Sequence, residues 1–180
     1  MFKIASLLLL ALATASSQAQ IQNNASENYF VLNGLSHHFQ AAPKIMDSWN
    51  EENTGLAWQH VYSTAPYRYS TEVGVFKDSY GKQATYLTGA ALHTIQDSPR
   101  ISVGGMLGIA YRTRYVFNTY RQDPNGSPIL GYSKKELTPI GGLVLQVAIP
   151  STPIVVQTTF MPKVKQSVSG VLFGQMLVRF

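Results

Sequence analysis

The sequence contains no cysteine and few charged residues, and both absences narrow the class of protein to which it can belong. Without cysteine, the chain can form neither a disulfide framework nor a lipid-modified N-terminal cysteine. Charged residues make up 13% of the chain, and they form no cluster with aromatic residues of the kind that binds nucleic acid. We therefore expect no nucleic-acid partner. The net charge of +5 instead suits contact with anionic lipid head groups.

The sequence also lacks a long apolar helix. Its one apolar run, from Ile4 to Ala13, follows a positive charge at Lys3 and precedes the small-x-small pattern of Ser17-Gln18-Ala19. This order is typical of a secretory signal peptide, and the run is too short to span a bilayer. We therefore expect residues 1–19 to be a signal peptide and residues 20–180 to form a single exported domain.

After this segment no stretch has a helical period, and the chain divides into eight short runs of alternating apolar and polar residues. The runs begin near Asn28, Asn53, Tyr67, Gln83, Arg100, Leu137, Pro153 and Ser169. Most have about ten residues, which is the length of a tilted strand that crosses a membrane. Tyrosines near the run ends and a final run that stops at Phe180 are typical of outer-membrane barrels.

We therefore predict an all-β fold, an eight-stranded antiparallel up-and-down outer-membrane β-barrel. A soluble lipocalin-like barrel is the alternative, because alternation alone does not say which face meets water. With eight strands both chain ends lie at one rim, and the longer connections lie at the opposite, outer rim. We expect these outer segments at about residues 41–52, 79–82, 115–136 and 163–168, and short turns at 64–66, 95–99 and 150–152.

Strand parity predicts which side chains face the inside of this barrel. Glu72 is expected to face inward, because a carboxylate against lipid is costly. A period of two then turns Asp78 inward as well. In the first run the lipid face takes Val31, Leu35 and Phe39, which places Gly34, Ser36 and His38 inside.

A histidine, a carboxylate and a hydroxyl are thus expected at the outer rim, as His38, Asp78 and Ser79. Such a group is suited to acyl transfer, since the imidazole can take a proton from a hydroxyl and the acid can orient the imidazole. The residues alone leave two simpler interpretations open. Asp78 and Ser79 can form an ordinary turn, and His38 can be an interfacial side chain.

Several short motifs resemble the lipid A palmitoyltransferases of Gram-negative outer membranes (the PagP family). "VFKDS", Val75 to Ser79, resembles "AFKDS" of that family, and Ser36-His37-His38 resembles "SWH" or "TWH" at the end of its first strand. Further similarities lie at Trp49-Asn50-Glu51, at Thr159 to Lys163 and at Val178-Arg179-Phe180. The motifs occur in the family's order from about residue 29 to residue 180.

The resemblance implies an outer-membrane acyltransferase that moves a palmitoyl chain from a glycerophospholipid donor to lipid A, without a metal or an organic cofactor. It implies catalytic roles for His38, Asp78 and Ser79, with His37 as the alternative histidine. It further implies that Pro162 marks a lateral lipid gate and that Gly89, expected inside the barrel, limits acyl length. Arg112 and Arg114, near the third outer segment, are candidates to hold lipid phosphates. We expect a monomer or a homodimer in the outer membrane.

Two other functions remain open at this point. The first is a lipid acyl hydrolase, which would use the same groups with water as the acceptor. The second is a non-catalytic structural or adhesive barrel. Departures from the family favour the second of these: the amphipathic helix before the first strand is missing, and Asn53 stands where the family has a proline.

Overall fold

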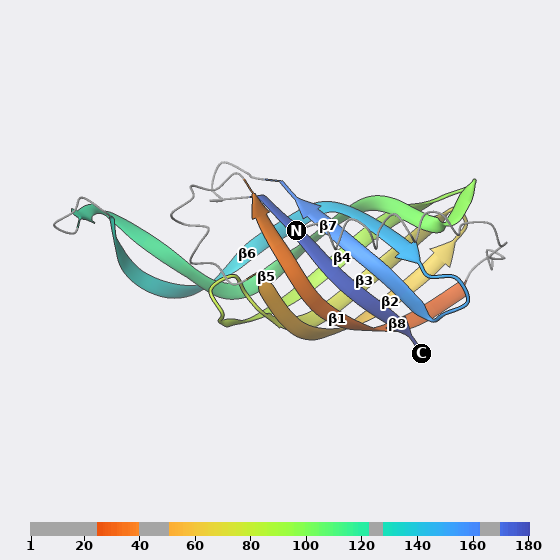
Figure 1. The fold of residues 1–180 in the computed structure, drawn as a ribbon, viewed down its shortest axis with the longest axis horizontal. Helices are drawn as coiled ribbons and strands as arrows, with labels where there is room; N and C mark the ends of the chain where they lie inside the picture. The colour runs from red at the N-terminus through yellow and green to blue at the C-terminus, as the bar shows by residue number, and fades with distance from the viewer. Residues whose placement is uncertain (1–24, 40–50, 123–127, 163–169) are drawn as a thin grey trace.

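The computed structural model describes residues 25–39, 51–122, 128–162 and 170–180. For residues 114–122 and 128–133 it describes the backbone but not the side chains. The expected signal peptide, residues 1–19, lies outside these ranges. The described strands form a closed barrel in which each strand pairs with its neighbours in chain order and β1 pairs with β8 (Figure 1). All pairs are antiparallel, so the predicted eight-stranded up-and-down barrel is confirmed. None of the described residues forms a helix long and apolar enough to cross a membrane.

The eight strands begin close to the positions expected from the sequence, with one exception. They are β1 (Ala25–Phe39), β2 (Glu52–Thr64), β3 (Tyr67–Lys77), β4 (Gln83–Ile95), β5 (Ser98–Gln122), β6 (Pro128–Ala148), β7 (Ile154–Met161) and β8 (Gly170–Arg179). We call the rim at which β1 begins and β8 ends the lower rim, and the opposite rim the upper rim.

The exception is β6, which begins at Pro128 and not near Leu137, so the expected outer loop at 115–136 is wrong. β5 and β6 pair as far as Gln122 and Pro128, and Figure 1 shows this hairpin extending well past the rest of the barrel. The polar composition of the segment suggested a loop. A hairpin outside the barrel needs no apolar face, because its backbone hydrogen bonds form between its own two strands.

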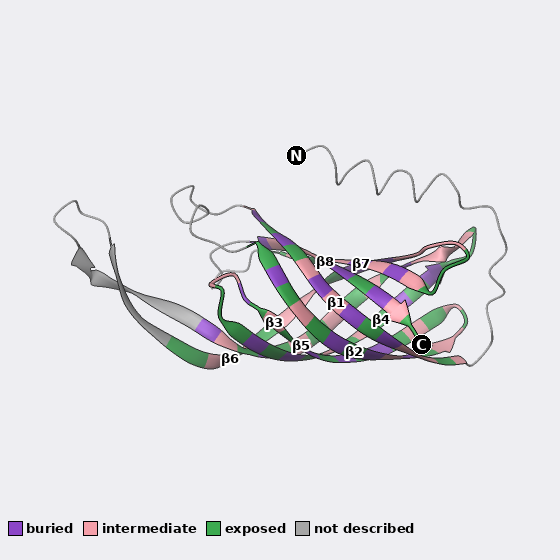
Figure 2. Cartoon of the chain, turned by 60° about the horizontal axis from the view of Figure 1, so that its bottom comes forward, coloured by how far each residue is buried: buried purple, intermediate pink, exposed green. Residues whose placement is uncertain are grey.

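Buried and exposed residues alternate along the barrel strands (Figure 2); many exposed side chains are apolar, whereas many buried ones are polar. Large exposed side chains include Leu87, Leu107 and Leu143, at 52%, 77% and 65% exposure. Buried polar side chains include Gln59, Glu72, Gln146, Gln157 and Gln175. A soluble barrel shows the reverse distribution, and an apolar outer band around a polar interior is typical of a transmembrane barrel. The lipocalin-like alternative therefore does not fit.

The buried polar side chains form one hydrogen-bonded layer, which we call the interior network: Asn33, Gln59, Glu72, Tyr86, Gln146, Gln157 and Gln175. The Glu72 carboxylate accepts hydrogen bonds from Gln59 Nε2 at 2.7 Å, from Gln175 Nε2 at 2.8 Å and from the Tyr86 hydroxyl. Gln175 Nε2 also donates to Asn33 Oδ1 at 2.7 Å, and Gln146 Nε2 donates to Gln157 Oε1 at 2.6 Å. Several donors thus share one buried carboxylate, which offsets its loss of hydration.

The first strand contains an irregularity that decides which residues face the interior near the upper rim. Val31 and Asn33 are buried, and the next buried residues are Ser36 and His38. The pairing register with β8 shifts between Asn33 and Ser36. The expectation that Val31 faces lipid is therefore wrong, since its side chain is fully buried. His38 faces inward as expected, because the shift at Gly34 changes the parity between the two ends of the strand.

Candidate functional site

A cavity of about 110 Å³ lies between the interior network and the upper rim, and we call it the upper cavity. Its walls are mainly apolar and include Phe76, Met106, Ile140, Val171 and Phe173. Its floor consists of members of the interior network: Glu72, Tyr86, Gln157 and Gln175. Ser79 lines the cavity near its upper end, where β3 has ended and the chain turns into β4. Ser79 therefore lies at the upper end of a cavity that has apolar walls and a polar floor.

Ser79 forms a hydrogen bond with His38 across the top of the barrel. The distance between Ser79 Oγ and His38 Nε2 is 2.8 Å. His38 is 4% exposed and comes from the end of β1, so the pair joins two parts of the chain that are 41 residues apart. A hydroxyl in this contact can transfer its proton to the imidazole, which is the arrangement that activates a serine.

Asp78 does not orient His38 as expected from the sequence. Its Oδ1 atom accepts hydrogen bonds from the backbone N–H groups of Tyr80 at 3.0 Å and Lys82 at 2.9 Å. Its own backbone N–H donates to the carbonyl of Lys82 at 2.8 Å. Asp78 therefore closes the turn that presents Ser79, which is the local role that Asp commonly takes in turns. Its Oδ2 atom is buried and accepts no hydrogen bond from the described residues.

The carboxylate beside the imidazole is that of Glu51. Glu51 Oε1 lies 3.8 Å from His38 Nδ1 and accepts a hydrogen bond from the His38 backbone N–H at 3.1 Å. The Glu51 carbonyl accepts a second hydrogen bond from the Ser36 backbone N–H at 2.8 Å. Glu51 is not among the site residues expected from the sequence. Its position directly before the second run, facing the end of the first run across a hairpin, was the available signal.

His37 is the less suitable of the two histidines. Its side chain is 57% exposed, and its Nδ1 atom lies 3.4 Å from Glu51 Oε1 on the outside of the strand. The hydrogen bond to Ser79 belongs to His38. Within the described residues, the geometry therefore assigns the inward histidine to position 38.

The remaining residues expected at the site have different positions. Gly89 is exposed on the outer face of β4, because Tyr86 and Thr88 of that strand face the interior, so the expectation that it limits the cavity is wrong. Arg112 lines the upper cavity. The side chain of Arg114 lies outside the described residues. Pro162 is exposed and directly follows the end of β7.

β7 covers only part of β6. Within the described residues their pairing runs from Leu143 with Phe160 to Ala148 with Val155, so residues 128–142 of β6 have no partner in β7. We call this the β6–β7 edge. Pro139 lies in it and Pro162 lies at its boundary, and a proline cannot donate a backbone hydrogen bond to a neighbouring strand.

Comparisons with known proteins give similarity in fold and none in sequence family. No protein-family model matches the chain, and no curated protein matches it. The crystal structure of Ail, the attachment invasion locus protein of Yersinia pestis, in complex with the heparin analogue sucrose octasulfate is similar at 12% identity. The alignment covers 88% of this chain and 100% of the Ail chain, with a TM-score of 0.51. The backbone structure of the Yersinia pestis outer membrane protein Ail in a phospholipid bilayer nanodisc aligns at 12% identity, over 87% of this chain and 100% of that chain, with a TM-score of 0.48.

Proposed function

We propose that this barrel is an outer-membrane acyltransferase, a divergent relative of the lipid A palmitoyltransferases. It would move a palmitoyl or similar acyl chain from a glycerophospholipid to lipid A at the upper rim. The observation that carries the proposal is the 2.8 Å hydrogen bond between Ser79 Oγ and His38 Nε2 beside a cavity with apolar walls. The barrel fold alone does not require this pair.

In the proposed chemistry the Ser79 hydroxyl can act as the nucleophile and the His38 imidazole as the base beside it. As Ser79 Oγ attacks the ester carbonyl of the donor, its proton passes to His38 Nε2, and the same proton then leaves with the glycerol oxygen as the ester bond breaks. A hydroxyl of lipid A next attacks the acyl-serine and gives its proton to His38, which returns it to Ser79. If Ser79 instead positions the substrate, His38 takes the proton of the acceptor hydroxyl as that oxygen attacks the donor ester, and gives it to the glycerol oxygen as the ester bond breaks. In either case Glu51 offsets the positive charge that forms on the imidazole.

Two further features support a lipid substrate. The apolar walls of the upper cavity suit an acyl chain, and among the described residues the β6–β7 edge shows no strand pairing beside Met161 and Ile140 of the cavity wall. We propose that a lipid tail enters from the bilayer at this edge. Arg112 lines the same cavity and is suited to a phosphate group of either lipid.

Mass spectrometry of lipid A from Gram-negative cells that express the chain tests this proposal. We expect a palmitate-sized mass gain with the wild type that is lost in His38→Ala and Ser79→Ala. His37→Ala is the matched control, because it removes the same side chain from the adjacent, outward-facing position. We expect this control to keep the mass gain.

A loss of mass in lipid A that depends on His38 and Ser79 would replace acyl transfer by acyl hydrolysis. An unchanged lipid A profile in every strain, with the barrel folded in the membrane, would overturn both enzymatic proposals. Folding is checked separately by the protease resistance of the membrane-embedded barrel, so an absent protein is not mistaken for an inactive one.

A non-catalytic adhesive barrel is the second candidate, and the comparisons favour it over acyl transfer. The structure that is similar in fold with a TM-score of 0.51 is that of Ail, the attachment invasion locus protein of Yersinia pestis, and none of the comparisons points to an enzyme. The long β5–β6 hairpin, which reaches past the upper rim (Figure 1), also suits a contact outside the membrane. Adhesion of expressing cells to host cells, lost on shortening this hairpin and kept in His38→Ala, is the outcome expected for this alternative.

A further inference from the structure

A second, larger cavity of about 420 Å³ opens at the lower rim, and we call it the lower cavity. It is lined by the two lower turns, at Ala65-Pro66 and Ile149 to Pro153, and by the strand ends beside them. It shares no lining residue with the upper cavity, and the interior network lies between the two. Nothing in the proposed acyl transfer uses it.

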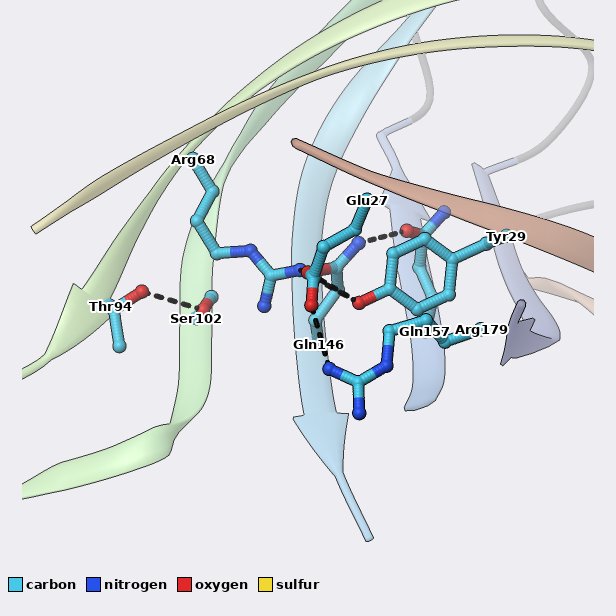
Figure 3. Close-up of polar contacts among 8 residues, drawn as sticks. All are labelled: Glu27, Tyr29, Arg68, Thr94, Ser102, Gln146, Gln157 and Arg179. Atoms are coloured by element: carbon cyan, nitrogen blue, oxygen red, sulfur yellow. Dashed lines mark hydrogen bonds and ion pairs between the residues drawn. The ribbon is translucent and has the colours of Figure 1, made fainter. Parts of the chain in front are cut away.

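The wall of the lower cavity contains a cluster of four charged or polar side chains, Glu27, Tyr29, Arg68 and Arg179 (Figure 3). Arg179 Nη1 donates to Glu27 Oε1 at 2.8 Å, and Arg68 Nη2 donates to Glu27 Oε2 at 3.3 Å. Arg68 Nη2 also lies 3.2 Å from the Tyr29 hydroxyl, which donates to Glu27 Oε2 at 2.8 Å. One carboxylate thus holds two guanidinium groups at the cavity wall.

The charges in this cavity do not balance. Arg68, Arg100 and Arg179 line it, and Glu27 is the one acid among the described lining residues. Arg68 and Arg179 alone exceed the charge of Glu27 by one positive charge. The hydrogen bonds of Arg68 and Arg179 to Glu27 and Tyr29 use one nitrogen of each guanidinium. The buried Nε atom of Arg68 has no hydrogen-bond partner among the described residues, although a charged donor without an acceptor is costly.

We infer that the lower cavity binds a soluble phosphate monoester. Such a group carries about −1.5 to −2 charge near pH 7 and offers three acceptor oxygens, which complements the positive charge of the wall and the guanidinium nitrogens of Arg68 and Arg179 that Glu27 and Tyr29 do not use. Guanidinium groups hold phosphate through paired hydrogen bonds. Thr94 lines the same space, and the volume leaves room for a small organic group attached to the phosphate.

Isothermal titration calorimetry with glycerol 3-phosphate, on the full barrel refolded in a neutral detergent, tests the inference. We expect saturable binding, with no heat from glycerol. Arg179→Gln and Arg68→Gln each remove a guanidinium, and we expect each to weaken binding by about tenfold or more. Glu27→Gln removes the competing carboxylate, and we expect it to strengthen binding several-fold.

The control variant is Lys82→Gln, which removes a positive charge at the upper rim, and we expect unchanged binding. If Arg68→Gln does not fold, the exposed Arg179 and the opposite effect of Glu27→Gln still decide the question. Absent binding, equal binding by Arg179→Gln, or weaker binding by Glu27→Gln would overturn the inference. So would binding seen only with nanodiscs that contain phosphatidic acid, because the ligand would then be a lipid head group. None of these outcomes bears on acyl transfer at Ser79.

Discussion

At the scale of single residues, two carboxylates lie near the Ser79–His38 pair and differ in their contacts. The carboxylate of Asp78 accepts two backbone hydrogen bonds within its own turn, whereas that of Glu51 lies beside His38 Nδ1. An acid that orients an imidazole must contact the ring nitrogen opposite the one that meets the hydroxyl. By that criterion Glu51 is better placed than Asp78 to assist His38.

This difference predicts unequal effects of two isosteric substitutions on the rate of acyl transfer. In Asp78→Asn the amide oxygen can still accept from Tyr80 and Lys82, so we expect near wild-type activity and stability. Glu51→Gln removes the negative charge beside the imidazole, and we expect the rate to fall by about tenfold. Both are measured by transfer of radiolabelled palmitate from phospholipid to lipid A in detergent. A loss in Asp78→Asn as large as that in His38→Ala would return the orienting role to Asp78.

At the scale of the strand, the irregularity in β1 shows what a pattern of alternating residues can and cannot predict. Strand number, pairing order and most strand starts follow from the alternation and the turn residues. The sequence also predicts which side chains of β3 face inward, because Glu72 fixes the inward face and no irregularity interrupts the alternation before Phe76. In β1 the shift near Gly34 changes the parity within the strand, so Val31 was assigned to the wrong face while His38 was assigned to the right one.

The errors at the site have a similar physical cause. Alternation assigns residues to a face, but it does not say which acceptor a carboxylate will meet. Asp78 is buried as expected, and its carboxylate accepts hydrogen bonds from the amides of its own turn. Gly89 was placed inside because glycine has no side chain to indicate its face. The interior network, which sets the floor of the upper cavity, depends on contacts between residues of seven strands.

The β6–β7 edge leads to a prediction about lipid entry. Continuing the observed register pairs Gly141 with Pro162, both on the outer face. A disulfide between Gly141→Cys and Pro162→Cys would join the edge, and the chain has no other cysteine to interfere. We expect palmitate transfer to fall by at least about tenfold when the bond is oxidised and to recover on reduction, because the entry path is blocked.

The matched control is the pair Val147→Cys and Val156→Cys, which lies in the same two strands where they are already paired. This cross-link should leave transfer unchanged in both redox states. Full activity of the oxidised edge variant would show that lipid does not enter between β6 and β7.

At the scale of the whole molecule, the apolar outer surface implies that stability depends on the surrounding bilayer. Leu87 is 52% exposed and lies near the middle of β4, whereas Gln83 begins the same strand at the upper rim. We expect Leu87→Arg to lower the free energy of unfolding by about 2–4 kcal/mol in lipid vesicles, and Gln83→Arg to lower it by about 0–1 kcal/mol. Urea titrations followed by tryptophan fluorescence measure both. Equal effects of the two substitutions would indicate that the apolar outer surface does not lie in the hydrocarbon of the bilayer.

The interior network has a consequence for the permeability of the membrane that holds this barrel. Because its side chains bond to one another across the lumen, the upper and lower cavities share no lining residue. We therefore expect the barrel to act as a sealed wall and not as a pore, so that a solute entering one cavity does not reach the other.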